Sequence, residues 1–362
     1  MSGLKEILRR RIALQGPLTV ADFMNEALHH PRYGYYASRD PLGKDGDFTT
    51  SPEISQVFGE LIGLWLAVVW QGMGTPDPVN LVELGPGRGT LMADALRAAK
   101  LVPGFRAAIR LHLVESNSVL RRKQKHALES AGLSSPPKWH QDFDEIPDGP
   151  VLLVANEFLD ALPIRQFQKN EGGWQERMVT IDLDDQLTFG LGPFMRKPPL
   201  LTKNVLRAPA GSVAEVSSAA ISLIHAIGTM LRRSGGCALI VDYGYAMSQP
   251  GDTLQAARNH RHVAVLDDPG GCDLTSHVDF AALIRAATET GSVTFGPLPQ
   301  GTFLRRLGLT QRIDALAAGS SPDLAAEMKI AGDRLISARH MGDLFKVLAI
   351  QHPDFPVPPA FE

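Results

Sequence analysis

The chain has 362 residues, of which 44% are hydrophobic and 21% charged, and its formal net charge is −3 at pH 7. This balance is ordinary for a globular protein and excludes the strongly basic surface of a typical nucleic-acid-binding domain. No apolar run reaches the length of a membrane-spanning helix, and two cysteines, Cys237 and Cys272, are too few for a disulfide framework. We expect a globular protein from a reducing compartment, built as one large domain or as a core with a smaller addition.

The N-terminus predicts two helices. Residues 4–14 form an amphipathic pattern that includes three consecutive arginines. Arginines there also occur in mitochondrial presequences, but these are poor in acids, whereas Glu6 lies inside this pattern. We therefore expect a mature helix and a bacterial cytoplasmic protein, or a protein of the mitochondrial matrix if the chain is eukaryotic. A second helix is predicted over Val20–His29, with Thr19 as its cap.

A further helix is predicted to begin near residue 50. Pro52 suits the first helical position after Ser51, and Thr50 and Glu53 could instead form a capping box. The residues before this start, 43–47, form a glycine-rich loop. Such a loop is typical of a lid that closes over a binding site.

From residue 79 onward, strand and helix patterns alternate, which predicts a mainly parallel sheet with helices on both faces. The fold class is therefore α/β, with a Rossmann-like sheet. The expected strands cover residues 79–84, 111–114, 136–139, 151–155, 238–242, 292–295 and 345–350, and the expected helices cover 91–99, 120–130 and 214–232.

Two stretches interrupt this alternation. Polar and apolar residues alternate on both sides of Gly172-Gly173, which predicts an inserted β-hairpin. Residues 244–275 are long and polar, as is typical of a lid or binding loop. We expect four consecutive parts: an N-terminal helical segment with the glycine-rich loop (1–75), the first half of the core (76–163), the inserted hairpin region (164–213), and the second half of the core with the lid loop (214–362).

The most informative motif is VNLVELGPGRGT at residues 79–90. A buried strand ends next to Glu83 and passes through a turn that contains Gly85, Gly87 and Gly89 into a helix. Glycines allow positive φ angles and a close approach of the backbone to a ligand. The motif resembles the start of a nucleotide-binding βαβ unit, but its E-x-G-x-G-x-G spacing differs from the G-x-G-x-x-G of a dinucleotide site.

A pyrophosphate would fit poorly beside Glu83. Two unit negative charges about 4 Å apart repel by about 4 kcal/mol at an effective dielectric near 20. A ligand with a cationic amino-acid end and no phosphate, such as S-adenosylmethionine, fits better. A dehydrogenase site and a turn that binds nothing are the alternatives at this point.

Two further segments follow strands of the predicted sheet. Glu115 ends the second strand, where a carboxylate can accept both hydroxyls of an adenosine ribose. A helix cap or a solvated strand end is the alternative for Glu115. Asp142 and Phe143 follow the third strand, where Asp142 could accept the adenine amino group and Phe143 could stack on the ring. Ordinary structural roles are the alternative for this pair.

The fourth strand is followed by Asn156, Glu157 and Asp160. In a doubly wound sheet, ligands bind beyond the carboxyl ends of the strands, so this segment lies where a transferred group would emerge. Two carboxylates suit a cationic nucleophile such as a guanidinium, which they can orient and help to deprotonate. A capped helix start with solvated acids is the alternative.

Other polar residues are less specific. His260, His262, His277 and Asp279 are close in sequence but lack the spacing of a known metal motif, so we expect no metal site. Tyr33, Tyr35 and Tyr36 either line a substrate pocket or pack the N-terminal segment.

Several segments together resemble the MidA-type S-adenosylmethionine-dependent methyltransferases. They are HPRYGYY (30–36), GDFTTSPEISQVFGE (46–60), VELGPGRGTLMADALR (82–97), LVESNSVLRRKQ (113–124), ANEFLDALPIRQF (155–167), LIVDYGY (239–245), GDTLQAARNH (251–260), DLTSHVDF (273–280) and MGDLFKVLAI (341–350). The resemblance covers nearly the whole chain in order. Ser116-Asn117-Ser118 departs from the Ser-Pro pair common in the family.

The resemblance implies a class I methyltransferase sheet and S-adenosylmethionine as cofactor. The mitochondrial member of the family is understood to dimethylate an arginine of the complex I subunit near the quinone site, so a protein substrate of that kind is implied here. The cofactor-binding residues implied are Glu83, Gly85, Gly87, Gly89, Glu115, Asp142 and Phe143, the catalytic ones Asn156, Glu157 and Asp160, and the substrate-pocket ones Tyr36, Asp47, Phe48, Thr49, Thr50 and Ser51.

Two rival functions fit the same residues. One is methylation of a small molecule on the same fold. The other is a chaperone of complex I assembly that binds S-adenosylmethionine without essential catalysis. The sequence indicates no oligomeric state.

Overall fold

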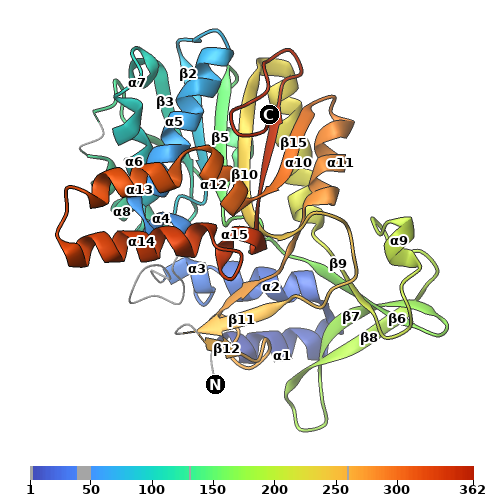
Figure 1. Ribbon diagram of the computed structural model, residues 1–362. Helices are drawn as coiled ribbons and strands as arrows, with labels where there is room; N and C mark the ends of the chain where they lie inside the picture. Colours follow the sequence, from blue (N-terminus) through green and yellow to red (C-terminus); the bar gives the residue numbers. More distant parts are fainter. Residues whose placement is uncertain (1–2, 39–49, 130–131, 259–260) are drawn as a thin grey trace. The chain divides into compact units, whose positions relative to one another are not determined.

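Figure 1 shows the computed structural model, which describes residues 3–38, 50–129, 132–258 and 261–362. The chain forms two compact units. Unit 1 comprises Met1–Phe48, Leu159–Ser222 and Tyr245–Leu283, and unit 2 comprises Thr49–Phe158, Leu223–Gly244 and Ile284–Glu362. Each unit gathers segments that are far apart in the sequence. The four consecutive parts of the sequence analysis describe chain order only and stay a prediction.

Unit 2 is built on a seven-stranded path with the order β15-β16-β10-β5-β2-β3-β4. Strands β10, β5, β2, β3 and β4 are parallel to one another, and β16 runs antiparallel to both β10 and β15. The strands are β2 (Val79–Leu84), β3 (Ile109–Val114), β4 (Lys138–His140), β5 (Val151–Asn156), β10 (Gly236–Tyr245), β15 (Val293–Pro299) and β16 (Phe345–Gln351).

The parallel strands are buried on both faces, as expected for continuous apolar runs covered by helices. On one face, Leu81, Val154 and Leu239 belong to a large apolar cluster. The opposite face carries Val82 and Leu153, which have no exposed surface.

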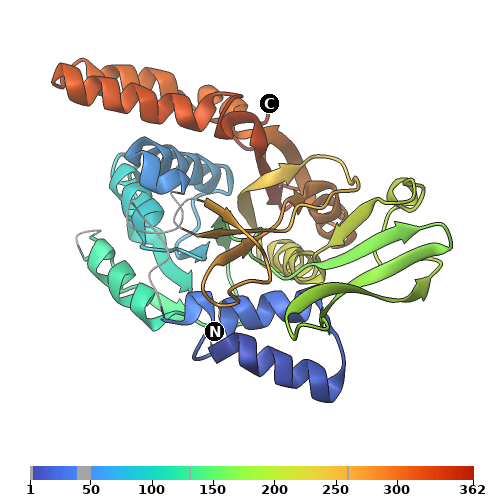
Figure 2. The ribbon, with the colours of Figure 1, turned by 90° about the horizontal axis from the view of Figure 1, so that it is seen from below.

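Two helices of unit 2 begin at clear sequence signals. Ser55 caps α5, and Asn117 caps α8 through two backbone amides. The helices of unit 2 are α4 (Ser51–Ile54), α5 (Gln56–Gly72), α6 (Thr90–Ala99), α7 (Phe105–Ala108), α8 (Ser118–Leu128), η1 (Phe143–Glu145), α12 (Gln300–Arg306), α13 (Leu309–Ala317), α14 (Pro322–Ile336) and α15 (Met341–Leu344), while α10 (Ser218–Ser234) and α11 (Phe280–Glu289) cross from one unit to the other along the chain. Figures 1 and 2 both show α13 and α14 side by side as a helical hairpin.

Unit 1 contains two small sheets. One has the order β1-β7-β6-β9, with β8 paired to β7, and the other has the order β12-β11-β13. Its elements are α1 (Gly3–Gln15), β1 (Leu18–Thr19), α2 (Val20–His29), α3 (Tyr35–Ser38), β6 (Arg165–Asn170), β7 (Gly173–Ile181), β8 (Leu187–Met195), α9 (Lys203–Leu206), β9 (Val213–Val216), β11 (Gln255–Arg258), β12 (Arg261–Val263), β13 (Asp273–Thr275) and β14 (Val278–Asp279).

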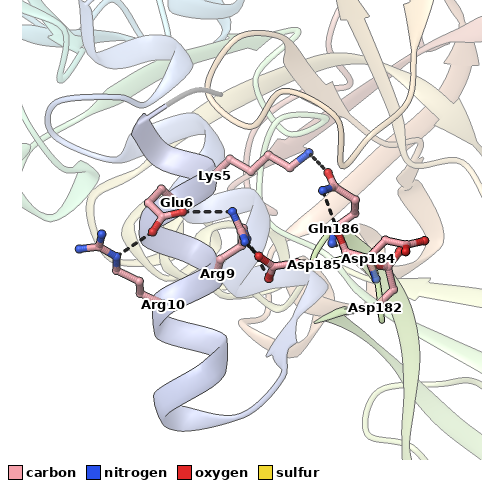
Figure 3. Close-up of polar contacts among 8 residues, drawn as sticks. All are labelled: Lys5, Glu6, Arg9, Arg10, Asp182, Asp184, Asp185 and Gln186. Atoms are coloured by element: carbon pink, nitrogen blue, oxygen red, sulfur yellow. Dashed lines mark hydrogen bonds and ion pairs between the residues drawn. The ribbon is translucent and has the colours of Figure 1, made fainter.

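Helix α1 is joined to the β7–β8 turn by charged side chains (Figure 3). The Arg9 guanidinium is paired with the carboxylates of Asp185 and Glu6, and Lys5 Nζ donates to Gln186 Oε1 at 3.0 Å. The apolar face of α1, formed by Leu4, Leu8 and Ile12, is buried in a cluster with α2. This apolar burial holds the helix, because exposed ion pairs contribute little stability.

Most of the expected elements are confirmed. Helix α2 has the predicted bounds and a capping box between Thr19 and Asp22. The predicted hairpin forms around Gly172-Gly173 and gains a third strand, β8.

Two expectations are wrong. Residues 213–216 form β9, so α10 begins at Ser218, because this segment pairs with β6. The helix near residue 50 breaks at Ser55, and Glu53 does not complete a capping box with Thr50. The lid loop expected at 244–275 contains the short strands β11, β12 and β13, and its role as a lid stays a prediction.

None of the helices in the described ranges combines the length and the apolar character needed to cross a membrane.

The close packing of α5 on α6 yields a prediction. A Cβ at Gly63 would lie 2.3 Å from the backbone oxygen of Ala95. Gly63→Ala should therefore lower the free energy of unfolding by about 2 kcal/mol through overpacking. An alanine in an unconstrained helix interior would raise it by about 1 kcal/mol. Chemical denaturation measures the difference. Val68→Ala on the exposed side of α5 is the control, and equal stability of wild type and Gly63→Ala would contradict the packing.

Candidate functional site

The candidate site lies where the strand order of the sheet reverses. From β2, the chain continues outward to β3 on one side, and β5 lies on the other side. Ligands of open α/β sheets bind in the crevice at such a switch point, beyond the carboxyl ends of the strands. The turn after β2 and the segment after β5 are therefore the two segments expected to form the site.

The turn after β2 depends on its glycines. Gly85, Gly87 and Gly89 have φ angles of +61°, +54° and +85°. Other residues adopt this left-handed conformation at a cost. A Cβ at Gly85 would lie 2.6 Å from the Phe158 ring. The three glycines thus allow the turn to pass close to the segment that follows β5.

Gln124 on α8 connects this turn with Glu115, the acid that ends β3. Its Nε2 donates to Gly87 O at 2.8 Å and to Glu115 Oε2 at 3.2 Å, while Trp139 Nε1 donates to Gln124 Oε1. The Gln124 side chain is fully buried. Gln124 could not be selected from the sequence, because no local pattern distinguishes it from other polar residues on a helix.

Glu115 is half-buried, and Asn117 N donates to its Oε1 at 2.8 Å. Burial raises the pKa of the Glu115 carboxyl, although its hydrogen bonds oppose this. The helix-cap alternative for Glu115 is wrong, since Asn117 caps α8. Beyond β4, the side chain of Asp142 is exposed and Phe143 is 8% exposed at the start of η1. Contacts of these two residues with an adenine stay a prediction.

Glu83 continues the buried row of Val79 and Leu81 on one face of β2. It is 3% exposed, and its Oε2 has no hydrogen-bond partner within the described ranges. Burial raises the pKa of the Glu83 carboxyl to about 8. Burial thus disfavours the negative charge expected beside the turn. The glycine spacing remains as the independent sign against a pyrophosphate.

The segment after β5 begins in a strained conformation. Glu157 has a φ of +50°, which is uncommon for a residue with a Cβ. Its amide donates to Val241 O at 2.8 Å, and its Oε1 accepts from Ser51 N at 2.8 Å and from Asn156 Nδ2 at 3.2 Å. Such strain persists only where the surroundings enforce it and is typical of functional sites.

Two hydrogen bonds to carboxylates connect helix α4 to other segments of unit 2. Its first residue, Ser51, binds Glu157, and Glu53 Oε1 accepts from Thr90 Oγ1 at 2.5 Å. Thr90 is the first residue of α6, directly after the glycine turn. Helix α4 therefore links the end of β5 with the helix that follows β2.

Four buried polar atoms of unit 2 have no hydrogen-bond partner within the described ranges: Gln300 Oε1 on α12, and Ser51 Oγ, Glu83 Oε2 and Asn156 Oδ1 in the segments described above. Glu83 is in register with Val154, and Asn156 lies two residues further along the same face of β5. Both side chains thus belong to the same face at the carboxyl ends of adjacent strands. Unpaired buried polar atoms are costly, so this group of atoms fits the amino and carboxylate groups of a ligand.

Asp242 is a residue that the sequence analysis did not select. It is fully buried in β10, next to β5, and its Oδ2 accepts from Phe158 N at 3.2 Å. Asp242 therefore fixes the backbone between Glu157 and the ring that contacts the glycine turn. Its position in the motif LIVDYGY was the available signal.

Tyr36, a residue predicted for the substrate pocket, lies in unit 1 among acidic side chains. Tyr36 Oη donates to Asp273 Oδ1 at 2.8 Å, and burial together with the charges of Asp273 and Asp160 raises the Tyr36 pKa well above its usual value. Tyr35 is 1% exposed and packs in the core of unit 1. The structure thus assigns Tyr35 to packing and Tyr36 to a polar cluster.

Glu157 and Asp160 belong to different units, since the division falls between Phe158 and Leu159. The proposed joint action of these carboxylates on one nucleophile stays a prediction. The alternative of a capped helix start is wrong, because the chain passes from this segment into β6. Thr50 is the first described residue of the predicted pocket segment, and Asp47, Phe48, Thr49 and the glycine-rich loop 43–47 lie outside the described residues.

Within the described ranges, no group of three or more histidine, cysteine or acidic side chains is arranged to hold a metal ion.

Comparison with known proteins identifies the chemistry. Residues 61–298 match the model of a family described as "Putative S-adenosyl-L-methionine-dependent methyltransferase". The match covers more than half of the chain. The chain belongs to this family. The methyltransferase resemblance and the cofactor expected from the sequence are thereby confirmed.

Solved structures support the same assignment. The chain is similar to a COG1565 superfamily member from Burkholderia thailandensis bound to S-adenosyl-homocysteine, with 28% identity, a TM-score of 0.85, and coverage of 99% of this chain and 94% of that chain. A native crystal structure of a COG1565 superfamily protein from the same organism has 30% identity, a TM-score of 0.84 and the same coverage. The expected class I methyltransferase fold is confirmed.

Curated relatives are named for their activity. The chain is 36% identical over 366 residues to "Protein arginine methyltransferase NDUFAF7, mitochondrial" of Homo sapiens, which covers 95% of this chain and 82% of the relative. The identity to the Danio rerio protein of the same name is 35% over 366 residues, with 95% and 85% coverage.

The buried Glu83 carboxyl yields a second prediction. Its pKa is raised from 4.5 to about 8, so its stabilising contribution is complete below pH 4.5 and is lost as pH rises through 8. Between these values the cost of burial should grow by about 1.4 kcal/mol per pH unit. Glu83→Gln, which remains neutral, should therefore gain stability relative to wild type as pH rises from 5 to 8.

Chemical denaturation of both proteins without cofactor at several pH values measures the difference in stability between them. The titration of other groups affects both proteins equally and cancels in this difference. Glu171→Gln on the exposed β6–β7 turn is the matched control and should follow wild type. A constant stability difference between wild type and Glu83→Gln would contradict the buried neutral carboxyl.

Proposed function

We propose that this chain transfers a methyl group from S-adenosylmethionine to an arginine of a protein substrate. The observation that carries the proposal is the Glu157 carboxylate at the carboxyl end of β5, which is fixed by Ser51 N and Asn156 Nδ2. The names of the curated relatives support the same activity.

The residues around the switch point fit this cofactor. Gly85, Gly87 and Gly89 would admit the amino-acid end near the backbone, and Glu115 would accept the ribose hydroxyls. Asp142 and Phe143 would contact the adenine. The unpaired atoms of Glu83 and Asn156 can meet the charged groups of the methionine part. When bound, S-adenosylmethionine supplies an electrophilic methyl group on a positively charged sulfur.

A protein that methylates arginine must help the guanidinium to lose a proton. The guanidinium pKa is above 12, so the nitrogen that attacks the methyl must lose a proton during the reaction. A carboxylate can align the guanidinium plane by two hydrogen bonds and take up that proton. Glu157 is suited to this role because its position is already fixed, so little orientation is lost when the substrate binds. Asp160 and Tyr36 of unit 1 are proposed as further substrate contacts.

The substrate that we propose is a complex I subunit near the quinone site. The support is the resemblance of nearly the whole chain to a family whose mitochondrial member is understood to modify that subunit. A chain of bacterial origin would carry out the reaction in the cytoplasm, and a eukaryotic one in the mitochondrial matrix.

The cofactor assignment predicts the effect of Gly87→Val. A branched side chain at a φ of +54° is strained and would occupy the approach of the ligand. Titration calorimetry should show binding of S-adenosylmethionine and S-adenosylhomocysteine to wild type and no detectable binding to Gly87→Val. Gly16→Val is the matched control, because Gly16 has a φ of +91° and no atoms near its Cβ position. Unchanged affinity in Gly87→Val would rule out this cofactor site.

The catalytic assignment predicts the effect of Glu157→Gln. Glutamine keeps the oxygen that accepts from Ser51 N, but it cannot take up a proton. Methyl transfer to the purified complex I subunit should fall about 100-fold or more, while cofactor affinity stays near normal. Incorporated label followed by peptide mapping measures the product and its position.

Glu129→Gln serves as the control for this substitution and should retain activity. Full activity of Glu157→Gln would exclude the carboxylate role. A methylated lysine or carboxyl group in place of arginine would exclude the arginine assignment and leave the fold and the cofactor unaffected.

A further inference from the structure

Unit 1 contains a cavity that none of the proposed cofactor or catalytic residues lines. Its walls include the apolar side chains of Ile164, Val205, Ile221 and Leu283. It therefore offers a separate binding site with an apolar lining, which is the general character of ligand pockets.

Two carboxylates line this cavity, those of Glu215 and Asp279. Tyr245 and His277 are its other titratable lining residues, and no lysine or arginine is among its described lining residues. An anionic ligand would meet two carboxylates and no fixed cation. The charge of the cavity thus favours a cationic ligand.

Glu215 has a structural role already. Thr253 N and Leu254 N donate to its Oε1 at 2.9 and 3.1 Å, Gln166 Nε2 donates at 2.8 Å, and the Thr253 hydroxyl is bound to Oε2. These bonds fix the carboxylate at the cavity wall. Glu215 would therefore act on a ligand chiefly through the electrostatic field of its carboxylate.

The Asp279 carboxylate can accept further hydrogen bonds. Ser248 Oγ donates to its Oδ2 at 2.6 Å, and Ala282 N donates to its Oδ1 at 3.0 Å. A carboxylate can accept about four hydrogen bonds, so about two positions are open for a ligand.

Tyr245 adds an acceptor and a ring. Burial together with the charges of Asp279 and Glu215 raises the pKa of the Tyr245 hydroxyl, so the phenol stays neutral. A neutral phenol oxygen can accept from a cation, and the ring face attracts one.

We propose that this cavity binds an arginine side chain of the substrate protein, with the charged group at Asp279 and Tyr245 and the aliphatic stem along Ile164 and Ile221. Long cationic side chains bury an apolar stem while their head seeks polar partners, which matches the lining. The cavity would recognise a basic residue of the substrate. This inference rests on the proposed function only in taking the ligand from a protein.

The test uses the full chain saturated with S-adenosylhomocysteine and carrying Glu157→Gln, which weakens the proposed acceptor site. The probes are Nα-acetyl-arginine amide, its neutral analogue Nα-acetyl-citrulline amide, and free arginine. Calorimetry or ligand-observed NMR gives the dissociation constants. Binding is measured without methyl transfer, so failure of the proposed reaction does not affect the result.

Asp279→Asn removes the charge and keeps an oxygen for the Ala282 amide, and Ala220→Phe fills the cavity from α10. Asp184→Asn, on the exposed β7–β8 turn, is the matched control. The arginine amide should bind at least about tenfold more tightly than the citrulline amide, a difference of about 1.4 kcal/mol. This preference should disappear in Asp279→Asn and Ala220→Phe and persist in Asp184→Asn.

Three results would overturn the proposal. The first is no preference for the arginine amide, or no binding of it at all. The second is a preference that persists in both Asp279→Asn and Ala220→Phe. The third is tighter binding of free arginine than of the amide, by tenfold or more, which would indicate a free amino acid as the ligand.

Discussion

The hydrogen bond from Ser51 N to Glu157 Oε1 joins two segments that are 106 residues apart in sequence. Glu157, which accepts this bond, has a left-handed backbone conformation directly after β5. Helix α4 is tied by the same contact to the carboxyl end of the sheet, and Glu53 ties it to Thr90 at the start of α6. The glycine turn, the end of β5 and α4 are therefore held by one set of hydrogen bonds.

The same region concentrates polar groups that burial would ordinarily exclude. On the face that β2 and β5 share, the residues are apolar up to the carboxyl ends of the strands. There Glu83 and Asn156 occur in place of apolar residues. Burial raises the pKa of the Glu83 carboxyl and favours its neutral form, which lowers the cost of placing it there. These costs are consistent with selection for ligand binding in a methyltransferase rather than for stability alone.

Much of the core could be predicted because its signals are local. The apolar run of β2, the three glycines and the periodic pattern of α6 lie within one short stretch, and Thr19 marks the start of α2 through a capping box. The cofactor class followed from the same stretch and from the family motifs.

The errors have a common physical cause, which is that the deciding partner is distant in sequence. Val213–Val216 becomes a strand because β6 pairs with it, although its pattern also suits a helix. Gln124, Asp242 and Asp273 gain their roles from contacts with remote segments. The raised pKa of Glu83 comes from its burial, which a sequence pattern does not reveal.

The central claim is that this methyltransferase modifies an arginine of a complex I subunit near the quinone site. Mass spectrometry of the respiratory subunits from cells with and without the protein tests it most directly. The account predicts one methylated arginine in that subunit that disappears in cells without the protein and returns when the wild-type chain is restored. An unmodified subunit in both kinds of cell, or a methylated arginine that persists without the protein, would contradict the claim.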